Sequence, residues 1–183
     1  MHGIQTWVAL PTESEEIEPG FAHHGQSDLP LVETSGATIR VIAGSAFGAG
    51  AKVTTHSPMF YAHIKLTPEM RIELPRDYSE RAVYVVNGEI ETDGNIYGQG
   101  HLLVFRSGGD AIVKAAKQTT LLALGGEPLG PRFIEWNFVA SSRERIEEAK
   151  ADWRAGRFKL PDADNKEFIP LPPDPPPPAN PIS

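Results

Sequence analysis

The chain has 183 residues, of which 40% are hydrophobic, enough for the core of one domain with attached arms. Its net charge is −7, and it has no cysteine, which excludes disulfides, thiolate nucleophiles and cysteine-based metal sites. Lys and Arg form no basic cluster, so direct nucleic-acid binding is not expected. The sequence contains neither an apolar run long enough to span a membrane nor a signal-peptide pattern, and we therefore expect a cytoplasmic protein.

Short runs with alternating or β-rich patterns dominate the sequence. In the clearest of them every second side chain is apolar, as with Ile39, Val41 and Ala43, which indicates a strand with one buried face. Arg81–Val86 is more apolar, as expected for a strand that is buried on both faces. In chain order, we predict strands at Gly3–Leu10, Ala37–Ala43, Phe60–Leu66, Met70–Leu74, Arg81–Val86, Leu102–Phe105, Ala111–Ala115 and Thr120–Leu124.

Turn signals separate these runs at short intervals. Asn87-Gly88 and Asp93-Gly94 predict tight hairpins, because both pairs supply residues that tolerate a positive φ. About nine strands with no helices between them favour a sandwich or closed barrel over βαβ units. The sequence therefore predicts an all-β fold.

One helix is predicted late in the chain, over residues 142–155. Ser141 and Glu144 match a capping box, in which a hydroxyl and a carboxylate satisfy the free N–H groups of the first turn. Gly156 is placed to end the helix. Three apolar residues form one stripe that can lie on the barrel wall: Ile146, Ala149 and Trp153. Residues 170–183 are mostly proline, which favours either a disordered tail or a docking arm for a partner.

Several stretches, taken together and in order, resemble the pirin family over about residues 2–170. They are His2–Pro11 (HGIQTWVALP), Ile39–Gly44 (IRVIAG), Thr55–Pro58 (THSP), Tyr84–Glu89 (YVVNGE), Gly126–Gly130 (GEPLG) and the helix followed by Gly156-Arg157-Phe158. The resemblance implies a cupin-like, RmlC-like jelly-roll β-barrel with one C-terminal α-helix and extended terminal arms. Members of this family have two cupin barrels, and this chain is similar to the C-terminal one, without the N-terminal metal-binding cupin.

In the family, iron or another divalent metal lies in that first cupin, held by three histidines and a glutamate. Some members resemble quercetin dioxygenases, and the human-type member is described as a nuclear transcription cofactor. The first cupin ligand motif ends in a glycine, and we align that glycine with Gly88. Glu80 then takes the place of the glutamate ligand, and Leu74 and Arg76 take the places of the two histidine ligands. Leucine has no lone pair, and arginine stays cationic, so we expect no metal or other cofactor in this chain.

Three residues remain as weak site candidates. Glu80 could project toward the barrel mouth as an acid or base, or it is an exposed loop residue paired with Arg76 or Arg81. His56 and His63 are weak metal-ligand candidates. His63 lies opposite an apolar strand face and is expected to point outward, and His56 is expected to be a turn residue.

These observations leave three functions open. The first is a non-catalytic structural or protein-interaction module. The second is part of a metal-dependent, quercetin 2,3-dioxygenase-like oxidoreductase whose metal-binding cupin is missing or on another chain, and the third is a small-ligand-binding barrel. We expect a homodimer or a larger complex without membrane insertion, in which the terminal arms either fold back onto their own sheet or exchange with a second chain. Phe168 and Ile169 would be the apolar partner-binding anchors of the C-terminal arm.

The chain is accordingly divided into five segments. The predicted segments are an N-terminal strand and acidic loop (1–36), the cupin barrel (37–140), the helix (141–157), an extended arm (158–171) and a proline-rich tail (172–183).

Overall fold

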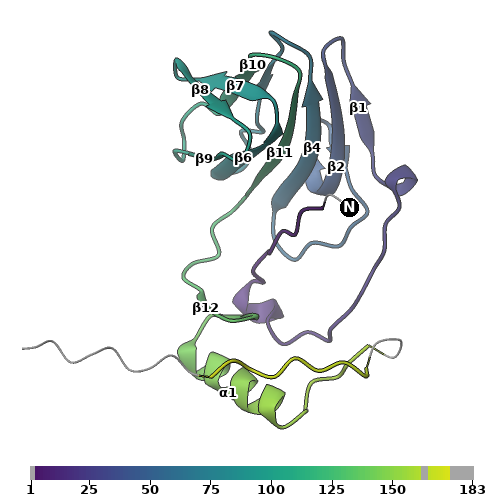
Figure 1. The fold of residues 1–183 in the computed structure, drawn as a ribbon, viewed down its shortest axis with the longest axis vertical. Coiled ribbons are helices and arrows are strands. Elements are labelled where there is room, and N and C mark those ends of the chain that lie inside the picture. Colours follow the sequence, from purple (N-terminus) through teal and green to yellow (C-terminus); the bar gives the residue numbers. More distant parts are fainter. Residues whose placement is uncertain (1–2, 162–164, 174–183) are drawn as a thin grey trace, which may run out of the picture. The chain divides into compact units, whose positions relative to one another are not determined.

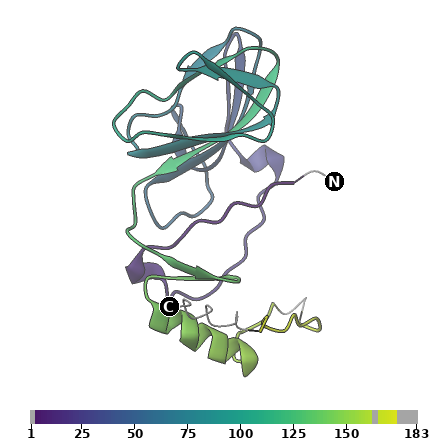
Figure 2. The same ribbon diagram turned by 60° about the vertical axis from the view of Figure 1, so that its left-hand side comes forward.

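The computed structural model describes residues 3–161 and 165–173 (Figures 1 and 2). The chain divides into two compact units, one formed by Glu16–Leu129 and the other by Met1–Glu15 together with Gly130–Ser183. Most of the predicted proline-rich tail, residues 174–183, lies outside the described residues. The five segments predicted from the sequence stay a prediction.

The helical elements and strands follow in chain order. The helical elements are η1 (Thr12–Ser14), η2 (Gln26–Asp28) and α1 (Arg143–Arg154). The strands are β1 (Leu31–Glu33), β2 (Ala37–Ala46), β3 (Ala49–Gly50), β4 (Met59–Leu66), β5 (Arg71–Glu73), β6 (Glu80–Asn87), β7 (Glu89–Thr92), β8 (Asn95–Gly98), β9 (Leu102–Phe105), β10 (Ile112–Ala115), β11 (Thr119–Gly126), β12 (Phe133–Glu135) and β13 (Phe138–Ala140).

Two antiparallel sheets make up the larger unit. The first has the strand order β1-β2-β4-β11-β6-β9, with β3 paired to β2, and the second has the order β5-β10-β7-β8. Every predicted strand except Gly3–Leu10 forms, with its ends shifted by a few residues. The all-β prediction for this unit is therefore confirmed, and closure of the sheets into a barrel stays a prediction.

One apolar core lies between the two sheets. It is formed by the alternate residues of β4 that the sequence placed on one face, Phe60, Ala62, Ile64 and Leu66, all of which are fully buried. The facing sheet contributes Ile90, Val113 and other buried side chains. Burying a side chain of this size contributes roughly 1.5–3 kcal/mol, so this alternation is the main reason that the strands take this register.

Of the two predicted hairpins, the one at Asp93-Gly94 is confirmed, and the one at Asn87-Gly88 is wrong, because β6 and β7 belong to different sheets. Gly88 connects β6 to β7 with φ +92°, and Asp93-Gly94 connects β7 to β8 with φ +50° and +73°. Glycine adopts these angles without the steric penalty of a side chain, and aspartate tolerates them better than most residues. The Asp93-Gly94 turn holds β7 beside β8, whereas Gly88 leads the chain from the first sheet into the second.

The helix begins one residue later than the predicted capping box. Ser142, rather than Ser141, is the N-cap, and its hydroxyl accepts a hydrogen bond of 3.1 Å from the backbone N–H of Arg145. Ser141 instead donates its hydroxyl to the Glu15 carboxylate at 2.8 Å, a contact 126 positions away that local sequence does not reveal. Gly156 ends the helix as predicted, with φ +66°.

The apolar stripe of α1 is used within its own unit. Ile146 and Ala149 are buried, and the helix packs on β12 and β13, a hairpin that the sequence analysis did not predict. Trp153 is half-buried in a group of aromatic rings with Trp136 and Phe158. Within its own unit, the apolar stripe of α1 packs on this hairpin. The sequence predicts the barrel wall as the surface that the stripe covers.

The predicted strand at Gly3–Leu10 is wrong. These residues pair with no strand in the described part of the chain, and most of their side chains are exposed. The segment is fixed at its end instead, because Arg132 Nη2 donates to the Leu10 carbonyl at 3.0 Å and Arg132 Nε lies 3.2 Å from the Glu15 carboxylate. Alternation shows that a segment can form a strand, but a strand also needs a partner with free backbone groups.

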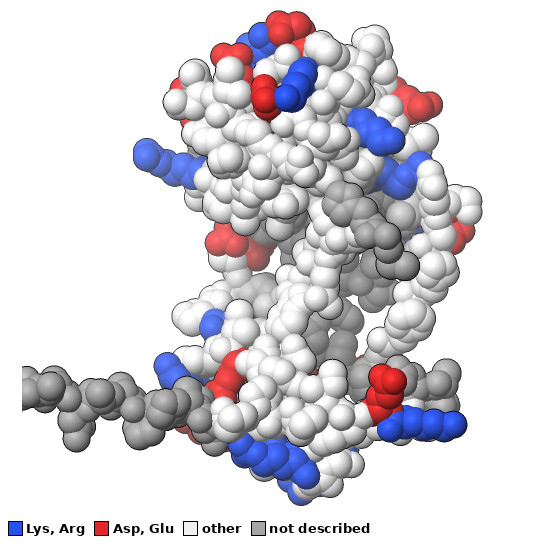
Figure 3. Space-filling model, viewed as in Figure 1, with Lys and Arg blue, Asp and Glu red and all other residues white. Residues whose placement is uncertain are grey.

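Charged side chains are scattered among uncharged ones on the face seen in Figure 3, where blue and red residues alternate without a broad patch of one sign. Within the described residues, no helix is long and apolar enough to cross a bilayer.

Candidate functional site

The two residues at the places of the cupin histidine pair point in different directions. Leu74 is 1% exposed and belongs to the core between the sheets. The Arg76 side chain is 67% exposed, forms an ion pair with Glu73 and donates from Nη2 to Asp110 at 2.9 Å. An aliphatic side chain offers no donor atom, and an ion-paired guanidinium offers only positive charge. These residues do not fit the metal that the cupin pattern implies.

Glu80 is the first residue of β6, and it is exposed. It makes no ion pair with any described residue, so the expected pairing with Arg76 or Arg81 is absent. Arg81 turns the other way: it is 4% exposed and donates from Nη2 to the Gly109 carbonyl at 2.5 Å. Strand alternation accounts for this difference, because neighbouring residues of β6 face opposite sides of the sheet.

The two candidate histidines lie apart from these positions. His56 is exposed in the bend before β4. His63 lies within β4, half-buried, on the face opposite the core, and its neighbours in the sheet are Arg40 on β2 and Leu122 on β11. Burial, together with the positive charges of Lys65 and Arg40, lowers the pKa of His63. Nearby cations that disfavour an imidazolium also disfavour a metal cation at the same place.

The described residues contain no group of three or more His, Asp or Glu side chains that could hold a metal ion. The sequence-predicted candidates Glu80, His56 and His63 are therefore not brought together into one site. Their roles stay predictions.

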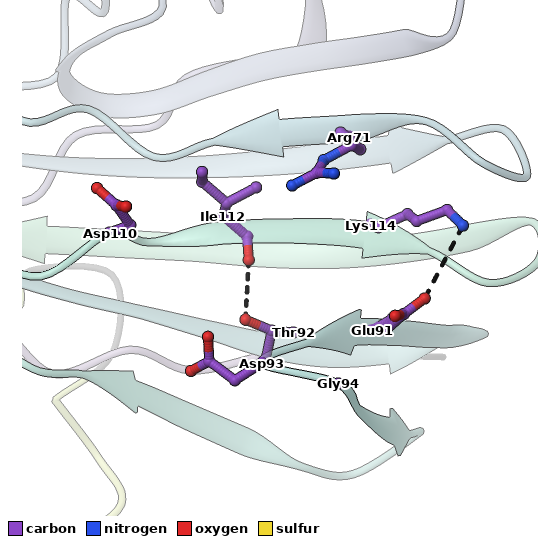
Figure 4. A pocket seen from close by; sticks show the side chains of 8 residues that line it. All are labelled: Arg71, Glu91, Thr92, Asp93, Gly94, Asp110, Ile112 and Lys114. Carbon is purple, nitrogen blue, oxygen red and sulfur yellow. Dashed lines mark hydrogen bonds and ion pairs between the residues drawn. The ribbon is translucent and has the colours of Figure 1, made fainter.

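The structure does bring together a set of charged side chains that the sequence analysis did not single out. They surround a cleft of about 330 Å³ on the second sheet (Figure 4). The cleft is lined by Arg71, Glu91, Thr92, Asp93, Gly94, Asp110, Ile112 and Lys114. The only sequence signal for it was the Asp93-Gly94 turn, because the other residues lie on strands whose pairing could not be known in advance.

Comparison with known proteins decides the family. The sequence model of the pirin C-terminal cupin domain matches residues 61–159, more than half of the chain. The chain belongs to the pirin family. The resemblance that the sequence motifs carried is thereby confirmed, and so is a cupin fold that is mostly β with one helix.

Individual pirin relatives extend over almost the whole chain. A pirin-like protein of Caulobacter vibrioides is 54% identical over 173 residues, which is 94% of this chain and 60% of that protein. A Pseudomonas aeruginosa protein, provisionally named a quercetin 2,3-dioxygenase, is 31% identical over 95% of this chain and 56% of its own length. The chain thus spans little more than half the length of the curated relatives that it matches.

A solved structure agrees with the pirin fold. The crystal structure of quercetin 2,3-dioxygenase from Acinetobacter baumannii superposes with a TM-score of 0.75 and 28% identity, covering 83% of this chain and 55% of that one.

Proposed function

We propose that this pirin-family chain is a non-catalytic cupin that serves as a structural or protein-interaction module. The observation that carries the proposal is the position of Leu74, which lies in the apolar core where the cupin pattern calls for a histidine ligand. Arg76, at the second histidine place, is held at the surface by Glu73 and Asp110. A metal centre at this place would need both side chains to be replaced.

The composition of the core supports the same proposal. The largest fully buried side chains of the described residues are apolar except for Thr119, whose hydroxyl donates to the carbonyl of Glu89. Close-packed apolar side chains stabilise a fold but supply no acid, base or ligand. The largest buried side chains of this unit therefore stabilise the fold and offer no group for catalysis.

Association with a partner is part of this proposal. Phe168 stacks on Trp153 of α1, yet Phe168 and Ile169 remain 56% and 68% exposed, and large apolar side chains at a surface favour protein–protein contact. A homodimer or a larger complex in the cytoplasm, without direct contact to nucleic acid, is the arrangement that we propose. The scattered charges in Figure 3 support the last point, because phosphate binding needs clustered Lys and Arg.

A second candidate is a role within a metal-dependent, quercetin 2,3-dioxygenase-like oxidoreductase. It is favoured by the similarity to the Acinetobacter baumannii enzyme and to the Pseudomonas aeruginosa relative. Iron or another divalent metal would then be held by an N-terminal cupin that is not among the residues described above, or by another chain. No catalytic step is assigned to the residues of this chain.

Quercetin turnover tests whether this chain is non-catalytic by itself. The purified chain is mixed in turn with Fe²⁺, Ni²⁺ and Cu²⁺, and the decay of quercetin absorbance is compared with the same metal solutions without protein. We expect equal decay, because the motif positions offer no ligands. Quercetin decay that exceeds the metal control and is lost in Glu80→Gln would overturn the non-catalytic proposal. Asp77→Asn, which removes a nearby carboxylate, is the matched control for that variant.

A further inference from the structure

We propose that the cleft on the outer face of the sheet β5-β10-β7-β8 binds a small zwitterion, one that carries a carboxylate at one end and an ammonium group at the other. The site is separate from the core and from the cupin motif positions. It is independent of the non-catalytic role proposed above.

The strand register places the lining residues on one face. Ile72, Val113 and Ile90 point into the core, so the residues that alternate with them point outward. Lys114 lies directly opposite Arg71 on one side and Glu91 on the other, which makes one row across three strands. Figure 4 shows these side chains on the same side of the sheet.

Three charged residues that line the cleft, Glu91, Asp110 and Lys114, already have ion-pair partners. Lys114 Nζ lies 2.7 Å from the Glu69 carboxylate and 3.8 Å from that of Glu91. The Asp110 carboxylate accepts a hydrogen bond from Arg76 at 2.9 Å. These pairs hold their side chains in place and leave them little capacity for a further charged partner.

One positive and one negative charge remain. Arg71 and Asp93 make no ion pair with any described residue, although both line the same cleft. Arg71 lies opposite Lys114, whose charge is already compensated by Glu69 and Glu91, so the guanidinium of Arg71 is the cation available to a ligand. A bound carboxylate would pair with Arg71, and Asp93 would pair with an ammonium group at the other end of the cleft.

Asp93 is held in position before any ligand arrives. It occupies the β7–β8 turn with φ +50°, and its carbonyl accepts a hydrogen bond of 3.1 Å from Asn95 Nδ2. The preceding residue, Thr92, donates its hydroxyl to the Ile112 carbonyl at 2.9 Å and so fastens the turn to β10 (Figure 4). Because these hydrogen bonds fix the backbone of the turn, less conformational freedom is lost there when a ligand binds, which favours affinity.

The size of the ligand follows from the sheet geometry. Arg71 on β5 and Asp93 in the turn after β7 lie on either side of β10, two strand spacings and two residues apart, so their Cα atoms are about 12 Å apart. The arginine side chain spans part of that distance, and the Ile112 side chain lies between the two charges as an apolar floor (Figure 4). A short alkyl chain that ends in a carboxylate and an ammonium group fits this arrangement, and a volume of about 330 Å³ holds a molecule of that size.

Three matched probes test the proposal in NMR titrations of the full chain. They are δ-aminovalerate, which carries both charges, valerate, which carries only the carboxylate, and pentylamine, which carries only the ammonium group. We expect δ-aminovalerate to shift the amide signals of Thr92, Gly94 and Lys114, and to bind about fivefold more tightly than either single-charge probe. Equal binding of valerate or pentylamine, shifts elsewhere in the chain, or no shifts with δ-aminovalerate would each overturn the proposal.

Two variants test the assigned contacts. Arg71→Gln should reduce δ-aminovalerate affinity about fivefold, and so should Asp93→Asn, which keeps a residue that tolerates the turn conformation. Lys65→Gln, an exposed cation on β4 of the other sheet, is the matched control and should bind as the unaltered chain does. If either cleft variant binds δ-aminovalerate as tightly as Lys65→Gln does, the substituted residue does not contact the ligand, and the proposal is wrong for that residue. Melting temperatures equal to that of the unaltered chain show that the variants are folded.

Discussion

The rings of Trp153 and Phe168 stack on one another, with centroids 5.4 Å apart and planes inclined by 18°. The indole Nε1 of Trp153 also donates a hydrogen bond of 2.9 Å to the carbonyl of Ile169. The predicted partner-binding anchors therefore contact the helix of their own chain. The sequence predicts that the arm folds back onto its own sheet or exchanges with a second chain; in this structure it contacts α1, and exchange stays a prediction.

This contact should stabilise the unit that contains α1. Phe168→Ala is expected to lower its free energy of unfolding by about 1 kcal/mol, because the stacked pair is lost while the rest of the aromatic group remains. Removing residues 160–183 should lower the melting temperature further or dissociate an assembly, and removing only 172–183 should change little. Tryptophan fluorescence during denaturation and light scattering measure both effects. An unchanged melting temperature and oligomeric state after the longer deletion would show that the arm contributes neither to stability nor to assembly.

The two motif positions should differ sharply in their effect on stability. Leu74→Ala removes a fully enclosed side chain and is expected to cost about 2–5 kcal/mol. Arg76→Ala removes only exposed ion pairs and should leave the denaturation midpoint unchanged within error. Chemical denaturation of both variants checks this. A small loss in Leu74→Ala would mean that this position is not part of the core.

The two turn glycines should also differ. At Gly88, an added Cβ would lie 2.5 Å from the Gln118 carbonyl oxygen and 2.7 Å from Thr119 Cα, whereas at Gly94 it would meet nothing within 4 Å. Gly94→Ala should therefore cost about 1–2 kcal/mol, from its positive φ alone. Gly88→Ala adds a clash with backbone and should cost about 2–5 kcal/mol. Equal midpoints in urea denaturation would contradict this distinction.

Much of the fold could be predicted because the deciding information is local. The alternation in Phe60–Leu66 sets a strand face directly, and Asp93-Gly94 sets the β7–β8 hairpin, whereas the turn at Asn87-Gly88 joins two sheets, which local sequence does not reveal. The strand predicted at Gly3–Leu10 did not form, because its outcome depends on whether a partner strand is available. The helix start shifted to Ser142 for a similar reason, since Ser141 is engaged by Glu15 from the far end of the chain.

The candidate site was harder to predict than the fold. The motif alignment identified Leu74 and Arg76 as unsuitable ligands, a conclusion that rests on residue chemistry alone. The cleft beside Arg71 and Asp93 could not be seen in the sequence, because it depends on β5, β7 and β10 meeting in one register. Likewise, whether Arg81 faces the core or solvent was undecided until the face of β6 was known.

His63 should make stability depend on pH. Because its pKa is lowered in the folded chain by burial and by Lys65 and Arg40, the unfolded chain takes up a proton there first as the pH falls through about 6.5. The contribution of neutral His63 to the free energy of unfolding is therefore present above that pH, and it is lost as the pH falls toward the lowered pKa of His63 in the folded chain. His63→Gln should flatten this part of the profile.

The exposed His56 provides the control for that experiment. His56→Gln should retain the loss of stability between pH 7 and pH 5 that the unaltered chain shows. Melting temperatures across that range give the comparison. If His63→Gln and His56→Gln gave the same profile, His63 would not be the group responsible.

The central claim is that the cupin fold of this chain does not hold a transition metal at its motif positions. Elemental analysis of the purified chain after dialysis against a chelator tests it most directly. With Leu74 in the core and Arg76 ion-paired at the surface, we predict far less than one iron, nickel, copper or zinc atom per chain. A value close to one tightly held metal per chain would contradict the account.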